Sequence, residues 1–432
     1  MKIFKKYAEH LDALLDHIDW GERFAENEVQ VNNSLNGEAG EVLRRLASPS
    51  RMRKVGAFFT GADLADQSVR PLRKLRGLTQ CPVYDPTCGA GDLLLSWADA
   101  LPITPNLQST IEVWENLIVG HDVWDEFLRV AKRRLVLKAI ARGSRLKRGK
   151  PLNIDKTFHE LKKGDALKQT FGKEVRTILM NPPFGMADSR NDCEWSSGNV
   201  SLAALLFDSC VTQAANDTRI VAILPEVLRS GSRYEVWRQQ VGGRFDVRRM
   251  TSYGRFDSHA DVDVFILEGT VVSRNVNPIS WWASECSTRG KVNDLFNVTV
   301  GAVVPHRDPH EGQWAPFVTS RSLAPWTETQ SVRTRRRFKG TKVQPPFVAV
   351  RRTSAPRDSE RAIGAIVLGS ESVAVENHLI ILRPHDGTLA ACRRLMKNLR
   401  HHRTRSWLNE RIRCRHLTVG IVGELPLWED IE

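Results

Sequence analysis

The chain has 432 residues, which is long for a single domain and enough for two hydrophobic cores. Hydrophobic residues make up 41% and charged residues 26%, an ordinary globular composition that excludes a mainly disordered chain. The formal charge is +13, and from Gly301 to Glu432 there are 22 lysines and arginines against 13 aspartates and glutamates, which indicates phosphate binding or a merely soluble basic surface.

The first fifty residues are expected to be helical, because apolar residues such as Phe4, Leu11 and Leu14 recur near the helical period. This segment also intersperses charges where a signal peptide would need an apolar core, and the chain has no run of about 18 apolar residues. We therefore expect a cytoplasmic protein without a membrane partner. The seven cysteines form no Cys-x-x-Cys pair, which argues against a disulfide framework and against a metal site.

From Pro82 onward, short apolar runs alternate with helical segments. The expected strands are Pro82–Tyr84, Leu117–Gly120, Thr177–Met180, Ile220–Leu224, Val247–Tyr253 and Val262–Leu267. The expected helices include Asp92–Asp99, Asp125–Ala141 and Ser201–Ala215, the last capped by Ser201. This alternation predicts an α/β domain in which helices cover both faces of a mostly parallel sheet.

Beyond about Trp281 the alternation ends, and frequent prolines interrupt segments that are too short for long helices. We expect a helical segment over residues 1–50, an α/β domain over 51–280 and a basic domain over 281–432. Two clusters of basic residues in the last domain could contact phosphates, although the second also has the spacing of a solvated helix face. The clusters are Arg333, Arg335, Arg336, Arg337 and Lys339, then Arg393, Arg394, Lys397, Arg400, Arg403 and Arg405.

Three acidic residues follow successive expected strands. Asp85 is followed by Gly89 and Gly91, so the backbone can approach a ligand while the carboxylate receives a cationic amino group. Asp122 ends the next strand, where its carboxylate can accept both hydroxyl groups of a ribose. Asp165 follows a weakly marked strand and can accept a hydrogen bond from an adenine amino group. Each acid alone fits an ordinary loop, whereas the ordered series indicates a ligand that contains a nucleoside.

A tetrapeptide, Asn181-Pro182-Pro183-Phe184, follows the expected strand that ends at Met180. The amino nitrogen of adenine is a poor nucleophile because its lone pair is delocalised into the ring. The Asn181 side-chain oxygen and the Pro182 carbonyl can each accept one amino hydrogen, which localises that lone pair, and the prolines fix the backbone. Phe184 offers a face on which a base can stack. A simple proline turn after a buried strand is the alternative.

The glycine loop, the three acids and the tetrapeptide together resemble the amino-group DNA methyltransferases of the gamma arrangement. That group includes type I modification subunits and type II adenine methyltransferases. The resemblance covers roughly Arg53 to Gly269 and continues weakly beyond. It implies a Rossmann-like domain with a mostly parallel seven-stranded sheet, S-adenosylmethionine as the cofactor, and a mixed C-terminal domain that recognises a target in double-stranded DNA.

The family also has a cofactor motif before the glycine loop, which Lys54–Gly61 resembles. By this resemblance Thr60 would hold the carboxylate of the cofactor and Phe59 would pack near it, while Gly61 stands where the family usually has proline. The resemblance assigns the methionine part to Asp85, Gly89 and Gly91, the ribose to Asp122 and the adenine of the cofactor to Asp165. It also assigns to Phe256 a contact with the flipped base, for which a plain core position is the alternative.

The expected activity is transfer of a methyl group to the N6 amine of a flipped adenine, in the modification component of a restriction-modification or related defence system. The chain lacks the Pro-Asp dipeptide of common metal nucleases, so a nuclease would reside in a separate partner subunit. One alternative is methylation of cytosine N4, RNA or protein glutamine, which the same tetrapeptide serves. Another is a catalytically silent DNA-binding subunit. Asn rather than Ser at position 181 favours adenine over cytosine, and the basic C-terminal domain favours nucleic acid.

Overall fold

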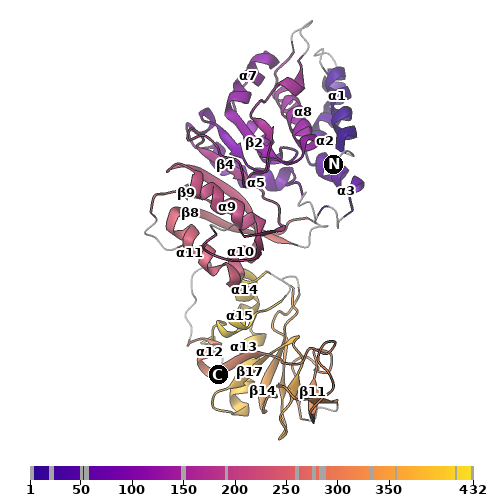
Figure 1. Ribbon diagram of the computed structural model, residues 1–432, viewed down its shortest axis with the longest axis vertical. Helices are drawn as coiled ribbons and strands as arrows, with labels where there is room; N and C mark the ends of the chain where they lie inside the picture. The colour runs from indigo at the N-terminus through magenta and orange to yellow at the C-terminus, as the bar shows by residue number, and fades with distance from the viewer. Residues whose placement is uncertain are drawn as a thin grey trace. The chain divides into compact units, whose positions relative to one another are not determined.

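The computed structural model divides into two compact units (Figure 1). The first unit consists of Met1–Leu228 with Arg233–Ile279, and the second consists of Arg229–Ser232 with Ser280–Glu432. The structure describes residues 4–18, 24–48, 52, 58–146, 152–189, 193–257, 262–274, 279–281, 289–330, 334–355, 358–413 and 416–429. Positions 54–57 of the expected cofactor motif, and Arg333 of the first basic cluster, lie outside these residues.

A seven-stranded sheet forms the centre of the first unit, in the order β3-β2-β1-β4-β7-β9-β8. Its strands are β1 (Val83–Asp85), β2 (Ile118–Asp122), β3 (Leu161–Lys163), β4 (Thr177–Met180), β7 (Arg219–Pro225), β8 (Phe245–Arg255) and β9 (Asp263–Val271). The first five strands in this order are parallel, and β9 runs antiparallel to both β7 and β8. The predicted α/β fold with a mostly parallel seven-stranded sheet is confirmed.

Helices surround this sheet, as Figure 1 shows. They are α5 (Ala62–Arg73), α6 (Asp92–Ala98), α7 (Leu107–Leu117), α8 (Asp125–Ala141), α9 (Leu202–Gln213), α10 (Glu226–Ser230) and α11 (Glu235–Arg244). The three expected helices are present, and their ends differ from the predicted ones by at most two residues. Ser201 occupies the N-cap position of α9, but its side chain makes no capping hydrogen bond. A short hairpin, β5 (Met186–Asp188) with β6 (Asn199–Ser201), follows the tetrapeptide.

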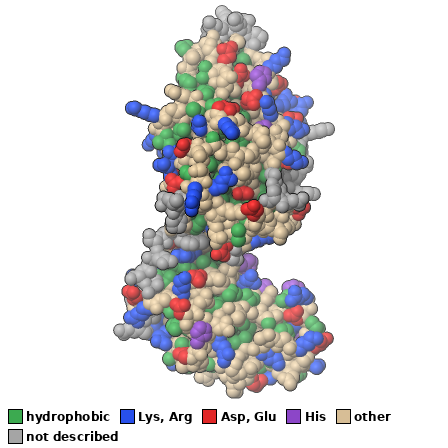
Figure 2. Space-filling view, turned by 60° about the vertical axis from the view of Figure 1, so that its left-hand side comes forward, with side chains coloured by type: hydrophobic (Ala, Val, Ile, Leu, Met, Phe, Trp, Pro, Cys, Tyr) green, Lys and Arg blue, Asp and Glu red, His purple; other side chains and the backbone are tan. Residues whose placement is uncertain are grey.

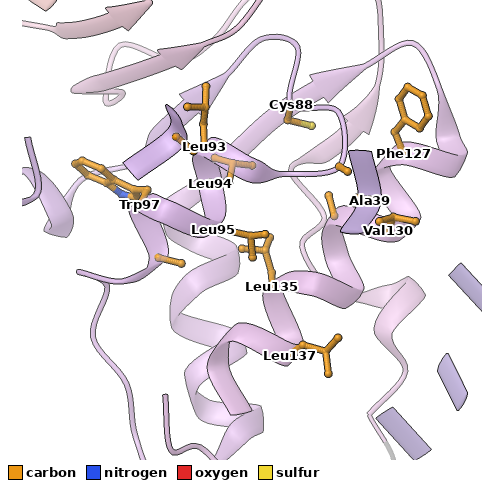
Figure 3. Packing of buried hydrophobic residues seen from close by; sticks show 14 of the residues in the cluster. Ala39, Cys88, Leu93, Leu94, Leu95, Trp97, Phe127, Val130, Leu135 and Leu137 are labelled. Atoms are coloured by element: carbon orange, nitrogen blue, oxygen red, sulfur yellow. The ribbon is translucent and has the colours of Figure 1, made fainter. Parts of the chain in front are cut away.

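The predicted helical start is confirmed by α1 (Lys5–Ile18), α2 (Phe24–Leu35) and α3 (Glu38–Leu46). Their apolar faces join the same buried cluster as α6, α8 and one face of the sheet. Figure 3 shows this packing, with Leu93, Leu94 and Leu95 of α6 and Leu135 of α8 among the cluster. The helices therefore share one core with the sheet and do not form a separate body.

A buried arginine ties α2 to the loop after β1. Arg134 of α8 has no exposed side-chain surface. Its guanidinium donates to the Ser34 carbonyl (2.7 Å), the Ala90 carbonyl (2.6 Å) and the Asp92 carboxylate (2.8 Å). A buried charge requires such partners, because the interior does not solvate it. The start of α6 and the end of α2 are thus held by a single side chain.

The frequent prolines of this region predicted irregular structure, but the second unit is built on two β-sheets. A five-stranded sheet has the order β10-β17-β14-β15-β12, and a smaller sheet has the order β13-β11-β16. The strands are β10 (Phe296–Val300), β11 (Gln313–Val318), β12 (Glu328–Thr329), β13 (Arg335–Phe338), β14 (Phe347–Arg351), β15 (Gly364–Val367), β16 (Ala374–Val375) and β17 (Leu379–Pro384). The helices are α12 (Val292–Leu295), α13 (Leu389–Arg400), α14 (His402–Arg411) and α15 (Val419–Gly423). The mixed structure expected for this region is confirmed.

One buried cluster of the second unit joins α13 and α14 to the larger sheet, through residues such as Leu395, Leu408, Val348 and Ile380. Four residues of the second basic cluster lie on the exposed face of α13, which confirms the helical spacing there, while Arg403 and Arg405 lie on α14. None of the helices in the described part of either unit is long and apolar enough to cross a lipid bilayer.

Candidate active site

One pocket in the first unit collects most of the predicted site residues. The expected cofactor residues Phe59, Thr60, Asp85, Gly89, Asp122 and Asp165 all line it. Asn181 and Pro183 of the tetrapeptide line the same pocket, whereas Gly91, Pro182, Phe184 and Phe256 do not. The lining comes from the ends of β1, β2, β3 and β4, which meet at one edge because the four strands are parallel. The strand pattern therefore brings distant residues to one place.

The glycine loop leaves room that a side chain would close. Gly89 has φ 53° and Gly91 has φ 88°, a backbone conformation that residues with a side chain rarely adopt. A Cβ atom at Gly89 would lie 3.0 Å from the Phe59 ring, and one at Gly91 would lie 3.2 Å from the Ala131 Cβ. Gly89 therefore keeps the pocket open, while Gly91 allows close packing of the loop on α8.

Asp122 links the glycine loop to the start of α8. One carboxylate oxygen accepts a hydrogen bond from the Gly89 backbone (3.0 Å), and the other accepts from the Trp124 backbone (2.9 Å). Burial raises the pKa of Asp122 to about 6, although the backbone donors act in the opposite direction. Asp165 is more exposed, and its carboxylate accepts from the Leu167 backbone (3.1 Å). Both acids keep lone pairs that a bound hydroxyl or amine could use.

Asp85 is the most strongly perturbed acid of the pocket. It is 1% exposed, and one of its oxygens accepts a hydrogen bond from the Thr87 backbone (3.1 Å). Burial raises the pKa of Asp85 to about 8, and the nearby Asp122 and Asp92 carboxylates add to this rise. A cationic group in the pocket would restore the ionised form, so the site is poised to accept positive charge.

Asp85→Asn should reduce the pH dependence of stability. Folding raises the pKa of Asp85 from 3.8 to about 8. The favourable contribution of Asp85 to the free energy of unfolding is therefore fully present below pH 3.8 and is lost as the pH rises towards 8. Urea unfolding of the ligand-free chain at pH 5 and pH 8 measures this loss. We expect a smaller loss in the variant, by about 2 kcal/mol or more. Asp125→Asn, where the side chain is 63% exposed, is the control. Equal losses in Asp85→Asn and in the unchanged chain would contradict the assignment.

Asn181 lies directly after β4, and its amide is held on one side only. The amide nitrogen donates a hydrogen bond to the Thr60 hydroxyl (2.9 Å), and the backbone carbonyl accepts one from the Thr87 hydroxyl (3.4 Å). The amide oxygen is buried and has no hydrogen-bond partner among the residues that the structure describes. An unpaired buried acceptor costs about 1 to 3 kcal/mol, so this oxygen is available to a donor other than the described residues.

Phe184 and Phe256 form an aromatic pair beside the pocket. Their ring centroids are 5.2 Å apart and the rings are nearly perpendicular, at 88°. Phe58 packs edge-on against Phe256 in turn, at 6.5 Å. Phe256 is only 8% exposed, so it supports the Phe184 ring from the core side. Contact of either ring with a base stays a prediction.

Sequence reasoning missed several residues of this site. Thr87 and Trp124 both line the pocket, and each follows an acid by two residues. The signal that could have found them is their position in the sequence, two residues after an acid that ends a strand. The departure at Gly61 also has a structural reason, because its backbone donates to the Asp92 carboxylate (2.8 Å) at φ 74°. Proline has neither the N–H nor access to that φ.

Residues 32–217 match the family model described as N-6 DNA Methylase, a match that includes the glycine loop, the three acids and the tetrapeptide. Over these residues the first unit is similar to N-6 DNA methylases. The resemblance inferred from the motifs is confirmed for this part of the chain. No curated protein was found to match this chain.

Two solved structures share the fold over most of this chain. The type IIL restriction-modification enzyme MmeI, solved in complex with DNA, is 13% identical over 89% of this chain and 70% of its own, with a TM-score of 0.54. The DrdV–DNA complex is 9% identical over 93% of this chain and 58% of its own, with a TM-score of 0.50. A modification subunit of a putative type I restriction enzyme from Vibrio vulnificus YJ016 is 18% identical over 54% of this chain, with a TM-score of 0.38. The chain spans 49% of that subunit.

Proposed function

We propose that this protein is a site-specific DNA methyltransferase that transfers a methyl group from S-adenosylmethionine to the N6 amine of a flipped adenine. The observation that carries the proposal is the Asn181 amide oxygen, which is buried with no partner among the described residues, at a pocket lined by a glycine loop and three carboxylates. The similarity to N-6 DNA methylases supports the choice of DNA and of N6. A role as the modification component of a restriction-modification or related defence system belongs to the same proposal.

The residues of the pocket fit S-adenosylmethionine. Asp85, with its raised pKa, suits the cationic amino group of the methionine part, and the open space beside Gly89 admits a ligand close to the backbone. Asp122 and Asp165 have acceptor capacity left for ribose hydroxyls and an adenine amine. When bound, S-adenosylmethionine supplies an electrophilic methyl group.

The tetrapeptide would prepare the amine of the target base. Asn181 accepts one amino hydrogen through its side-chain oxygen, and the Pro182 carbonyl accepts the other, so the nitrogen lone pair is no longer delocalised into the ring. Pro182 and Pro183 keep that carbonyl in place because their φ angles are fixed. Phe184, held by Phe256, offers a stacking face worth about 1 to 3 kcal/mol. Such contacts offset part of the cost of flipping the base out of the duplex.

The second unit would contact the DNA backbone. Arg394, Lys397 and Arg400 lie on the exposed face of α13, which is a suitable arrangement for phosphates. In the first cluster, by contrast, Arg336 is 4% exposed and donates to the Asp308 carbonyl, so we no longer expect it to contact phosphate. On the face shown in Figure 2, basic side chains are interspersed with acidic ones.

Replacing both Arg394 and Lys397 by alanine should weaken DNA binding by about 10-fold at 0.1 M salt, because two phosphate contacts are lost. The slope of log affinity against log salt should fall by about 2. Fluorescence anisotropy with labelled duplex at several salt concentrations measures both. The matched control removes two exposed lysines of α1, Lys5 and Lys6. Equal weakening in the variant and the control would mean that α13 makes no particular contact.

The proposed activity is tested by offering purified chain and labelled S-adenosylmethionine to unmethylated DNA, RNA and protein in parallel, then mapping modified bases by sequencing. We expect N6-methyladenine in DNA at one recurring sequence. Label at cytosine N4, in RNA or in protein alone would replace the proposal with the corresponding alternative. Absence of S-adenosylmethionine binding at high micromolar concentration would identify a silent DNA-binding subunit. A partner nuclease, if present, should co-purify without being needed for methylation.

A further inference from the structure

The orientation of the Asn181 amide is fixed by a residue far away in the sequence. The amide nitrogen donates to the Thr60 hydroxyl at 2.9 Å, across 121 residues of chain. An amide group is planar, with its oxygen and nitrogen on opposite sides of the carbon that carries them. Anchoring the nitrogen on Thr60 therefore determines where the oxygen points. That oxygen is the buried atom without a partner in the described chain.

The residues on both sides of Thr60 are held in place by other contacts. The next residue, Gly61, donates its backbone N–H to the Asp92 carboxylate (2.8 Å), and Asp92 is paired with the buried Arg134. The preceding residue, Phe59, packs edge-on against Phe127 with ring centroids 4.9 Å apart. A hydroxyl can donate as well as accept, and here its oxygen accepts from the Asn181 amide while its own proton remains available for another acceptor, such as the cofactor carboxylate. Once that acceptor takes the proton, the hydroxyl can only accept, so the amide must keep its nitrogen on this side.

We propose that Thr60 is a positioning residue, whose hydroxyl selects the Asn181 amide orientation that presents oxygen to the target amine. The inference rests on the proposed function of Asn181. In the opposite orientation the amide would present N–H groups to an amine that also donates, and the amine lone pair would stay delocalised. Thr60 thus acts on the transfer step through Asn181, in addition to the contact with the cofactor carboxylate that the family resemblance implied.

Three substitutions test this role in the full chain: Thr60→Val, which keeps the shape and removes the hydroxyl, Thr60→Ser, which keeps the hydroxyl, and Asn181→Ala. Single-turnover methylation is measured with S-adenosylmethionine and DNA both saturating, and calorimetry gives the dissociation constant of S-adenosylmethionine. We expect Thr60→Val to lower the saturating rate by about 10-fold, as expected from the loss of one hydrogen bond. Thr60→Ser should restore most of the rate.

The double variant separates positioning from a general structural role. In the Asn181→Ala background, Thr60→Val should have no further effect on the saturating rate, because the amide that it orients is gone. Full additivity of the two losses would overturn the proposal. An unchanged saturating rate in Thr60→Val, with only weaker S-adenosylmethionine binding, would also overturn it and leave Thr60 with the cofactor alone.

Two further measurements keep these results interpretable. Thermal unfolding of each variant is recorded, and if Thr60→Val does not fold, Thr60→Ala takes its place in the same cycle. If Asn181→Ala methylates DNA at the full rate, the proposed function of Asn181 is contradicted. If Asn181→Ala methylates DNA slowly but removal of the Thr60 hydroxyl leaves the saturating rate unchanged, only the positioning role of Thr60 is contradicted.

Discussion

Asn181→Ala should lower the rate of methyl transfer by about 10² to 10³-fold, the usual cost of losing one group that acts on the reacting atoms in a preorganised site. The side-chain oxygen of Asn181 is the only acceptor of the tetrapeptide that the substitution removes, since the Pro182 carbonyl remains. Affinities for S-adenosylmethionine and for DNA should stay within a few-fold of the original, because the acids of the pocket and the second unit are untouched. Single-turnover methylation with both ligands saturating measures the loss.

Asn199→Ala is the matched control, because Asn199 is an exposed residue on the hairpin that follows the tetrapeptide. It should methylate DNA at nearly the original rate. If Asn181→Ala were as active as this control, the amide oxygen would have no role in the reaction and another group would have to localise the lone pair. A joint loss of rate and of S-adenosylmethionine affinity would indicate instead that the pocket had collapsed.

Arg134→Ala should lower the free energy of unfolding of the chain by about 3 to 5 kcal/mol. The substitution leaves the buried Asp92 carboxylate without its partner and removes the donors to the Ser34 and Ala90 carbonyls. Urea unfolding followed by circular dichroism measures the change, and the variant should also bind S-adenosylmethionine more weakly because the glycine loop is no longer anchored.

The control for this experiment is Arg129→Ala on the same helix. Arg129 is 37% exposed, and its guanidinium lies 3.7 Å from Asp155. Pairs of this kind contribute about 0 to 1 kcal/mol. A loss in Arg134→Ala no larger than in Arg129→Ala would mean that the buried network contributes little to stability, and that packing alone attaches α2 to the loop.

Much of the first unit could be predicted because its signals are local. The β4 bounds Thr177–Met180 and the α8 bounds Asp125–Ala141 match the expected ones, since each apolar run is interrupted by a turn or an acid. Acids at strand ends could be placed at one edge because parallel strands share their carboxyl ends. Local pattern and topology together therefore predicted the residues at the strand ends, whereas Phe59 and Thr60 were predicted from the family resemblance.

The rest depended on contacts between distant residues. The helix α7 was missed because it ends at Leu117, directly before β2, without a turn residue between them. The bond between Asn181 and Thr60 joins segments that no periodicity relates. Arg336 was grouped with its neighbours as a phosphate contact, but it lies on a strand whose residues alternate between exposed and buried. A run of arginines gives no sign of that alternation.

Gly61 bears on how this protein could be engineered. A consensus approach would replace it by the proline that its relatives usually carry, expecting a stiffer loop and a gain in stability. Here the backbone N–H of Gly61 satisfies Asp92, and its φ of 74° is closed to proline. Positions 61 and 92 therefore form a coupled pair, and a proline can be introduced at the first only together with a redesign of the second.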